Sequence, residues 1–468
     1  MTAKLTDALR ALVGTDGVLD DASELSGYRG DLACQSNGPL LAVVRPRSTA
    51  EVVGIVRVCG ESGIAVTARG GGTGLAGGAA PSADRPSIVL SFERMRAIRT
   101  VDAVGDVIVV EAGCTLHDAR EAAACAKRLL GLDHGGASSQ IGGNLATNAG
   151  GNNVLRYGMA REQVLGLEVV LADGQVLSML SPLRKNNAGY DLRQVFLGSE
   201  GTLGLITAAA LKLRPAATVR VTACIGLASL GAVLNLYVRA RSVLGEAISA
   251  FELLPRAGLE LHFSHAGERR EPFATVTPWT VLLEADSASP FFDLQRAVEE
   301  LFAVAMHDGV VMDGTIAASE AQREALWRMR EGIAHAMIET AGSLKNDSAV
   351  PIAAIELFIA RATEAVDAIV PGCRPVPFGH VGDGNIHFNV LPPVDMHHEQ
   401  FAKRQKELSE AIDTVALSLG GTVSAEHGIG ALKRTALHRM RSAAEIDAMQ
   451  RLKGAFDPQN LFNPGKVL

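Results

Sequence analysis

Two histidines and a later Glu-His pair have the residue types of a divalent-metal site. His380 and His387 stand on either side of Gly382-Asp383-Gly384, a sequence that favours a tight reversal between two strands. Such a reversal would bring the two imidazoles together. Downstream, Glu426 and His427 lie in a short glycine-flanked turn. Two histidines and one carboxylate make a ligand set for a divalent metal, with zinc as the first choice, and leave one position open for a substrate.

The spacing alone also allows a purely structural role for these histidines. A His-x6-His spacing is not specific to metal sites, and isolated histidines usually satisfy hydrogen bonds inside a protein core. Side chains alternate along a strand, so His387 and Asn389 would share one face while Ile386 and Phe388 pack on the other. The pattern therefore predicts a polar face and leaves its occupant open.

Two glycine-rich stretches have the composition of phosphate-binding loops. They are RGGGTGLAGG at 69–78 and SSQIGGNLATNAGG at 138–151. The first contains a formal G-x-G-x-x-G, but Ala79-Ala80-Pro81 follow where a nicotinamide-dinucleotide site needs a helix to begin. Glycine N–H groups can instead converge on phosphate oxygens, with Ser, Thr and Asn side chains completing the cradle. Ordinary tight turns are the alternative for either loop alone. The absence of a Walker A sequence argues against an NTPase.

These loops and four further motifs resemble the FAD flavoproteins of the vanillyl-alcohol-oxidase or p-cresol methylhydroxylase (PCMH) type. The other motifs are RPRSTAEV from Arg45, RYG from Arg156, YDLRQVFLGSEGTLGLI from Tyr190 and FDPQNLFNPGK from Phe456, so the resemblance covers nearly the whole chain. It implies FAD held by the first and last parts of the chain, with the diphosphate on the two loops. The first loop has no His or Cys, and His134 only precedes the second, so we expect noncovalent FAD.

The FAD contacts that the resemblance implies lie on the two loops and at three further positions. They are Arg69, Gly70, Gly71, Gly72, Thr73, Gly74, Leu75 and Gly77 of the first loop, Ser138, Ser139, Gln140, Gly142, Gly143, Asn144, Thr147, Asn148, Gly150 and Gly151 of the second, and Gly201, Ile206 and Asn463.

The two histidine motifs are similar to those of the branch that oxidises D-2-hydroxyacids, which includes D-2-hydroxyglutarate and D-lactate dehydrogenases. The resemblance implies that His380, His387 and Glu426 bind the metal and that His427 is the base. A metal lowers the pKa of the substrate hydroxyl, a histidine takes the proton, and the hydride goes to flavin N5. The order of these two transfers stays open.

The resemblance also implies a substrate with two carboxylates. Arg330 and Lys345 match the Arg and Lys that hold carboxylate oxygens in D-2-hydroxyglutarate dehydrogenases, together with Asn389. A guanidinium offers a bidentate fork and an ammonium a point charge, which suits a dicarboxylate. Lactate-oxidising relatives look less cationic at the position of Lys345. Ala334 is a departure, because that branch has a Thr there, and solvated Arg and Lys side chains near a helix end are the alternative.

We therefore expect an FAD- and metal-dependent dehydrogenase that converts D-2-hydroxyglutarate to 2-oxoglutarate, with D-malate as a second substrate. The family suggests electron-transfer flavoprotein or a quinone as the electron acceptor, and a homodimer is expected. The alternatives are a D-lactate or glycolate dehydrogenase flavosubunit and a flavin-binding electron-transfer or assembly subunit without its own substrate. Intact His427, Arg330 and Lys345 argue against such a subunit.

Composition agrees with an enzyme-sized globular protein. The 468 residues suggest about three compact units, 47% are hydrophobic, and 24 of the 49 glycines lie between Gly60 and Gly204. A net charge of −7 and only 4% aromatic residues argue against a nucleic-acid partner. Six scattered cysteines without a CxxC pair are expected to be reduced thiols. Charged residues interrupt the N-terminus and polar ones interrupt 221–238, which predicts a cytoplasmic protein without a membrane span.

The elements that must position these residues predict an α+β fold. We expect a two-part PCMH-type FAD-binding domain over 1–215, an α+β substrate-binding domain with an antiparallel sheet over 216–396, and a small C-terminal helical domain over 397–468. Helices are expected over 50–62, 116–130, 229–243, 291–307, 400–419 and 443–456, and strands over 64–68, 87–91, 107–112, 205–213, 219–225 and 279–284.

Overall fold

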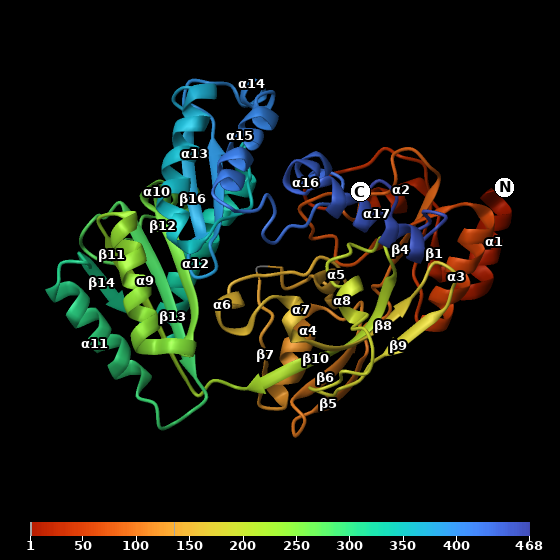
Figure 1. Ribbon diagram of the computed structural model, residues 1–468, viewed down its shortest axis with the longest axis horizontal. Helices are drawn as coiled ribbons and strands as arrows, with labels where there is room; N and C mark the ends of the chain where they lie inside the picture. The colour runs from red at the N-terminus through yellow and green to blue at the C-terminus, as the bar shows by residue number, and fades with distance from the viewer. Residues whose placement is uncertain (1, 135) are drawn as a thin grey trace. The chain divides into compact units, whose positions relative to one another are not determined.

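The computed structural model describes residues 2–134 and 136–468, which divide into two compact units (Figure 1). The first unit contains the chain up to Gly151, Gly158–Ala216 and Glu426–Leu468, and the second contains Asn152–Tyr157 and Ala217–Ala425. The chain crosses between units at 216/217, next to the expected boundary at 215/216.

The expected C-terminal unit over 397–468 is divided between these two units at 425/426. The segment is divided because its apolar side chains pack in two different cores. Leu408, Ile412 and Ala416 are buried in the core of the second unit, whereas Leu461 and Phe462 are buried in the core of the first. Helices in one stretch of sequence thus find apolar partners in two different cores.

One sheet of the first unit is largely parallel. Its order is β1-β2-β4-β3, formed by β1 (Val18–Leu19), β2 (Leu40–Val44), β4 (Ser87–Ser91) and β3 (Ala65–Arg69). Helix α3 (Thr49–Ser62) connects β2 to the parallel β3 by the crossover that such strands need. Ser48 caps it at one end, and Gly63 ends it with a φ of +67°. Residues 70–86, which follow β3, contain no helix, so the geometry of a nicotinamide-dinucleotide site is missing.

The other sheet of the first unit is antiparallel and has the order β5-β6-β10-β8-β9, with β7 also paired to β10. Its strands are β5 (Ile98–Asp102), β6 (Val107–Glu111), β7 (Arg128–Leu130), β8 (Val164–Val170), β9 (Val176–Met179) and β10 (Leu205–Pro215). The helix expected over 116–130 ends early: α4 spans Leu116–Cys125, because Lys127 takes a φ of +56° and the next three residues pair with β10.

Short helices complete the first unit. They are α1 (Thr2–Val13), α2 (Ala22–Leu25), α5 (Ile141–Ala146), α7 (Ala160–Gln163), α8 (Arg193–Phe196), α16 (Arg434–Met440) and α17 (Ala443–Phe456), with 3-10 turns at Thr15–Gly17 and Ser26–Tyr28. Lys453 lies in the last turn of α17, and its ammonium donates to the carbonyls of Thr202 and Phe462. Phe462, which follows α17, forms a bridge with Val66. These contacts attach the segment after α17 to the first sheet.

The second unit is a seven-stranded antiparallel sheet with helices on both faces, which confirms the expected α+β architecture. The sheet order is β14 (Asp313–Ile316), β11 (Val219–Leu227), β13 (Trp279–Ser287), β12 (Ile248–Pro255), β16 (Arg374–His380), β17 (Asn385–Leu391) and β15 (Ser348–Ala349). One face carries α9 (Leu230–Leu244), α11 (Leu294–His307), α13 (Ile355–Ile369) and α15 (Gln405–Ser418), and the other α10 (Arg256–Ala266) and α12 (Glu320–Glu339). Shorter elements are α6 (Val154–Tyr157), α14 (His398–Ala402) and 3-10 turns at Gly245–Ala247 and Ile352–Ala354.

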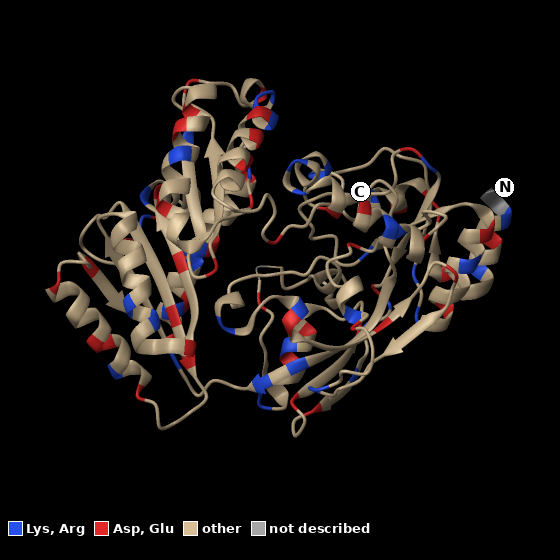
Figure 2. Ribbon diagram, viewed as in Figure 1, with Lys and Arg blue, Asp and Glu red and all other residues tan. Residues whose placement is uncertain are grey.

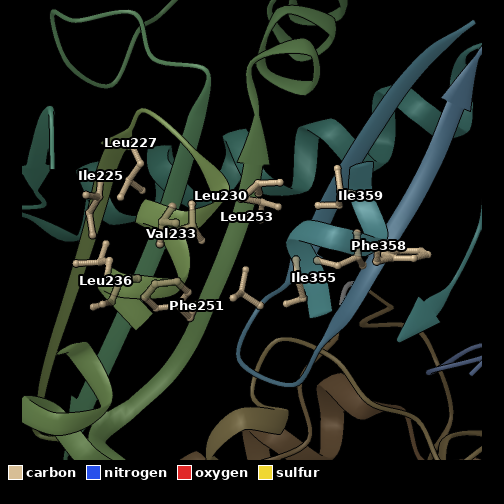
Figure 3. Close-up of a cluster of buried hydrophobic side chains, with 14 of the residues drawn as sticks. Ile225, Leu227, Leu230, Val233, Leu236, Phe251, Leu253, Ile355, Phe358 and Ile359 are labelled. Carbon is tan, nitrogen blue, oxygen red and sulfur yellow. The ribbon is translucent and has the colours of Figure 1, made fainter. Parts of the chain in front are cut away.

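Alternation along β12 decides which side chains reach each face of this sheet. Phe251 and Leu253 are buried in one core cluster with residues of α9 and α13, which include Leu236 and Phe358 (Figure 3). Leu254 packs in the opposite cluster with α10 and α12. Because side chains alternate, Glu252 points to the same face as Leu254.

The surface chemistry follows the composition. Figure 2 shows acidic and basic residues intermixed along the helices of each unit. No helix in the described part of the chain is long and apolar enough to cross a membrane. All six cysteines are free thiols, and Cys59, Cys114, Cys224 and Cys373 are buried.

Candidate functional site

The two glycine loops line one cavity of the first unit. Fifteen of the residues expected to contact FAD line it: Arg69, Gly70, Gly71, Gly72, Thr73, Gly74, Leu75, Ser139, Gln140, Gly142, Gly143, Asn144, Thr147, Gly201 and Ile206. The loops touch through bare backbone, since a Cβ on Gly71 would come within 2.7 Å of the Ser138 carbonyl oxygen. Contact between the loops is therefore sufficient to require glycine at position 71.

The chemistry of this lining fits a dinucleotide. The cavity offers a glycine-rich backbone together with Thr73, Ser139 and Thr147 hydroxyls. Gln140 is buried, and its Oε1 atom has no hydrogen-bond partner within the described residues. A bound polar ligand would satisfy that atom, since buried polar groups are almost always paired. The residues present therefore fit an FAD.

The other six expected contacts are outside the cavity lining: Gly77, Ser138, Asn148, Gly150, Gly151 and Asn463. Two of them, Asn148 and Asn463, stabilise the loops through hydrogen bonds instead. Asn148 has a φ of +52°, and its Oδ1 accepts a hydrogen bond from the Arg161 backbone. Asn463 donates from Nδ2 to the carbonyls of Gly78 and Glu200 at 2.9 Å each, which joins the C-terminal segment to the first loop.

His134 supports the second loop with both ring nitrogens. Nδ1 accepts a hydrogen bond from the Gly136 backbone at 3.1 Å, and Nε2 lies 3.2 Å from Oδ1 of Asn144. Because Nδ1 accepts, Nε2 carries the proton and donates to Asn144. Burial lowers the pKa of His134 below its ordinary value of 6.5. Oγ of Ser139 also lies 3.4 Å from Nε2. The uncharged ring thus supports two cavity residues, Ser139 and Asn144.

A buried carboxylate holds the turn that carries Glu426 and His427. Glu200 accepts hydrogen bonds from the backbone N–H groups of Ile429 and Gly430, both at 2.7 Å. Burial raises the pKa of the Glu200 carboxyl, in spite of these two hydrogen bonds. Glu200 and His427 both line the cavity. The histidine expected to act as the base therefore lies where the flavin is expected.

Glu426 contacts the end of the second glycine loop. Its Oε1 atom accepts the backbone N–H of Gly151 at 2.5 Å. Gly150 passes so close that a Cβ there would come within 2.4 Å of the same oxygen. Both loop residues belong to the first unit, as Glu426 and His427 do, while His380 and His387 belong to the second.

The predicted reversal between the two histidines of the second unit is confirmed. β16 ends at His380, β17 begins at Asn385, and Gly384 takes a φ of +83° in the connection. The imidazoles of His380 and His387 lie 5.6 Å apart between ring centroids. Ile386 and Phe388 are buried in the core on the other face, as alternation predicted.

Glu252 joins two of the expected site residues. Its Oε1 lies 2.7 Å from Nδ1 of His380, and its Oε2 accepts from Nε of Arg330 at 2.7 Å. Burial alone would raise the pKa of this carboxyl, but the adjacent His380 and Arg330 lower it to about 2. One buried carboxylate therefore orients an expected metal ligand and an expected substrate ligand.

The expected substrate residues lie on neighbouring elements of the second unit. Arg330 is a buried residue of α12, and its guanidinium carbon lies 5.1 Å from the centroid of the Phe378 ring. Asn389 is buried on β17, where Oδ1 accepts the backbone N–H of Asn346 at 2.9 Å. Lys345, which precedes Asn346, is exposed. Ala334 follows Arg330 by one helical turn, so it shares that side of α12.

A second group of metal-binding residue types lies on the exposed sides of α10 and α12. His265 and His335 direct Nε2 to the two carboxylate oxygens of Glu339, at 2.5 and 3.0 Å. These contacts with Glu339 account for the group, and all three side chains are 40% or more exposed. Surface ion pairs of this kind are common.

Sequence reasoning missed Glu200 and Glu252. Glu200 had a visible signal, since it lies inside the GSEGTLG motif. Glu252 had a weaker one: it is a lone carboxylate in the apolar strand ISAFELLP, where a charge needs a buried partner. Its partners are 78 and 128 residues away, beyond any local pattern.

Comparison with known proteins supports the expected family. Residues 40–179 match the FAD binding domain, and residues 216–467 match the C-terminal domain of FAD linked oxidases. D-2-hydroxyglutarate dehydrogenase from Xanthomonas citri pv. viticola is 36% identical, with 96% of this chain and 93% of that protein aligned. D-2-hydroxyglutarate dehydrogenase from Stutzerimonas stutzeri is 34% identical, with 99% and 98% aligned.

Solved structures support the fold. The structure of p-cresol methylhydroxylase with substrate bound matches 99% of this chain and 96% of that chain with a TM-score of 0.78 at 18% identity. This agrees with the PCMH-type architecture expected from the motifs. The match to the C-terminal domain of FAD linked oxidases covers more than half of the sequence, and the two relatives align along almost their whole length. The chain therefore belongs to the FAD-linked oxidase family.

Proposed function

We propose that this protein is an FAD- and metal-dependent dehydrogenase that oxidises D-2-hydroxyglutarate to 2-oxoglutarate, with D-malate as a second substrate. The observation that carries the proposal is that His427 lines the same cavity as the two glycine loops. A base and a flavin are needed at one carbon, because the substrate loses a hydroxyl proton and a hydride from the same centre. The names of the aligned relatives favour the five-carbon acid.

The chain's own residues supply binding and proton transfer. When bound, FAD supplies the hydride acceptor and the metal a Lewis acid for the substrate hydroxyl. His427 takes the hydroxyl proton at a ring nitrogen, while Glu200 keeps its turn in place through two backbone hydrogen bonds. Arg330, Lys345 and Asn389 hold the two carboxylates of the substrate.

The proposed metal ligands are His380, His387 and Glu426, with zinc as the first choice. The donor chemistry fits: because Glu252 engages Nδ1 of His380, Nε2 is the ring nitrogen that would bind the metal. Noncovalent FAD, electron-transfer flavoprotein or a quinone as acceptor, a homodimer and a cytoplasmic location complete the proposal. Residues 1–215 are proposed to bind the flavin and residues 216–396 the substrate.

Anaerobic reduction of the bound flavin tests the proposal. Adding D-2-hydroxyglutarate to the purified FAD-loaded protein should bleach the oxidised-flavin band at about 450 nm. L-2-hydroxyglutarate is the stereochemical control, and D-lactate and glycolate are the chain-length controls. Bleaching by D-lactate or glycolate alone would assign a shorter substrate, and no bleaching by any 2-hydroxyacid would indicate a subunit without its own substrate.

A further inference from the structure

Glu252 occupies an unusual place for a charge. It lies in the middle of β12, one of the inner strands of the second unit's sheet, and only 1% of its side chain is exposed. The register pairs it directly with His380 on β16. A buried carboxylate is costly unless its oxygens are paired, and here both oxygens have a partner at 2.7 Å. The contacts with His380 and Arg330 therefore explain why a buried strand can contain the Glu252 carboxylate.

The contact with His380 determines which ring nitrogen carries a proton. An ionised carboxylate can only accept hydrogen bonds, so Nδ1 of His380 must carry the hydrogen that points to Glu252. In the neutral form of this ring, the lone pair is therefore on Nε2. That tautomer binds a divalent metal through Nε2, and the carboxylate increases the basicity of the ring.

The contact with Arg330 orients the guanidinium. Glu252 uses the Nε–H of Arg330, and the plane lies near the Phe378 ring, 5.1 Å from its centroid. The terminal Nη groups make no hydrogen bond to any part of the chain that the structure describes. The edge of the guanidinium that can grip a carboxylate as a fork is thus available.

We propose that Glu252 is a positioning residue that fixes both the tautomer of His380 and the orientation of Arg330 through one carboxylate. Metal affinity and recognition of the distal carboxylate then depend on the same buried group. The inference rests on the proposed function, because it takes His380 as a metal ligand and Arg330 as a substrate ligand.

Glu284 provides a matched control on the adjacent strand β13. It is also buried, at 6% exposure, and accepts hydrogen bonds from Thr222 Oγ1 at 2.6 Å and Trp327 Nε1 at 2.8 Å. Trp327 belongs to α12, as Arg330 does. Replacing Glu284 by Gln therefore disturbs the same sheet and the same helix without touching His380 or Arg330.

The first measurement is the affinity for Zn²⁺ of the full-length, FAD-loaded protein, by competition with a chromogenic chelator. In Glu252→Gln, the amide NH₂ can donate to Nδ1 of His380, which moves the ring proton to Nε2 and removes the ligand atom. The dissociation constant for Zn²⁺ should rise about 10- to 100-fold, the usual effect of losing such a partner. Glu284→Gln should stay within about 2-fold of wild type, and FAD content should be unchanged in both variants.

The second measurement separates binding from turnover. Loss of the Arg330 orientation should raise KM for D-2-hydroxyglutarate more than KM for D-lactate, because only the longer acid has a distal carboxylate. Lower metal occupancy should reduce kcat for both acids, and added Zn²⁺ should restore it. A purely structural role would change neither the KM ratio nor the response to Zn²⁺.

The outcomes are separable. If the wild type binds no Zn²⁺, the proposed function and this inference both fail. If the wild type binds Zn²⁺ and folded Glu252→Gln binds it equally well, the inference alone is overturned. Should Glu252→Gln fail to fold, the double variant Glu252→Gln/Arg330→Met removes the unpaired buried cation, and the same loss of Zn²⁺ affinity is required of it.

Discussion

The backbone N–H of Gly151 donates a hydrogen bond to Oε1 of Glu426 at 2.5 Å. This contact joins the end of the second glycine loop to the carboxylate proposed as a metal ligand. Gly151 has a φ of +117°, and a Cβ there would lie 2.1 Å from the Asp133 carbonyl oxygen, so only glycine fits. A defined backbone donor therefore fixes the position of Glu426.

Replacing Gly150 by Ala should displace the Glu426 carboxylate. The new Cβ would lie 2.4 Å from Oε1, and the flexible side chain must move away from the Gly151 donor. We expect about 10-fold weaker Zn²⁺ binding with FAD content unchanged, because Gly150 is outside the flavin cavity lining. Gly454→Ala is the control, since a Cβ there meets nothing within 4 Å. Unchanged Zn²⁺ affinity would show that Glu426 is not a ligand.

Lys345→Ala should reduce selectivity for the longer acid. Loss of a charged hydrogen bond costs about 1.5 to 3 kcal/mol, or roughly 10- to 150-fold in kcat/KM. The loss should be larger for D-2-hydroxyglutarate than for D-lactate, and Arg330→Ala should show the same bias if it holds the distal carboxylate. Lys406→Ala, which removes a cation from α15, should have no effect. Equal losses on both acids would exclude a dicarboxylate-binding role.

His427→Ala should depress turnover of both acids equally, because the base acts at the carbon that they share. General-base catalysis contributes about 100- to 10,000-fold, so kcat should fall within that range. The variant should keep its FAD, and its flavin should still be reduced by dithionite. A large loss confined to D-2-hydroxyglutarate would assign His427 to substrate recognition instead.

Ala334→Thr should improve use of D-2-hydroxyglutarate. Ala334 lies one turn from Arg330 on α12, so a hydroxyl there can reach a substrate held by that guanidinium. One additional neutral hydrogen bond is worth about 0.5 to 1.5 kcal/mol, or roughly 2- to 12-fold in kcat/KM. Ala334→Val has the same shape without the hydroxyl and is the control. A gain in both variants would point to packing.

Acid should destabilise the first unit through His134. Burial lowers the pKa of this ring in the folded chain, so the unfolded chain binds more protons between that lowered pKa and about 6.5. Stability therefore falls as the pH is lowered through this window. Tm and FAD affinity should decrease from pH 7.5 to 5.5 in wild type and decrease less in His134→Asn, with His438→Asn as an exposed control. Parallel pH profiles for all three proteins would contradict this role.

Local chemistry made much of the fold predictable. α17 matches its expected bounds because Ser442 and Glu445 form a capping box, and the reversal after His380 follows from glycines that allow a tight connection. The helix expected over 400–419 is broken into α14 and α15, and α16 was not expected. The spacing over 400–419 is helical throughout, and the sequence of α16 has little periodicity. Tertiary packing therefore decides where these helices begin and end.

Long-range contacts were beyond prediction. Glu252 meets His380 only because β12 and β16 are neighbours in the sheet, although three strands and four helices separate them in the sequence. The division of 397–468 between two cores likewise depends on which apolar surface each helix finds. The sequence predicted which residue types form the candidate site. The buried carboxylates that orient these residues could be identified only from the folded structure.

The contact between Asn463 and Gly78 has a consequence for the order of synthesis. These residues are 385 positions apart, and all of Ala217–Ala425 is translated between them. At about 5 to 20 residues per second, a ribosome needs roughly 20 to 80 s to cover that distance. The second unit therefore has time to fold while the first glycine loop still waits for the segment that braces it. A chaperone that shields the early part of the first unit would have its greatest effect during that interval.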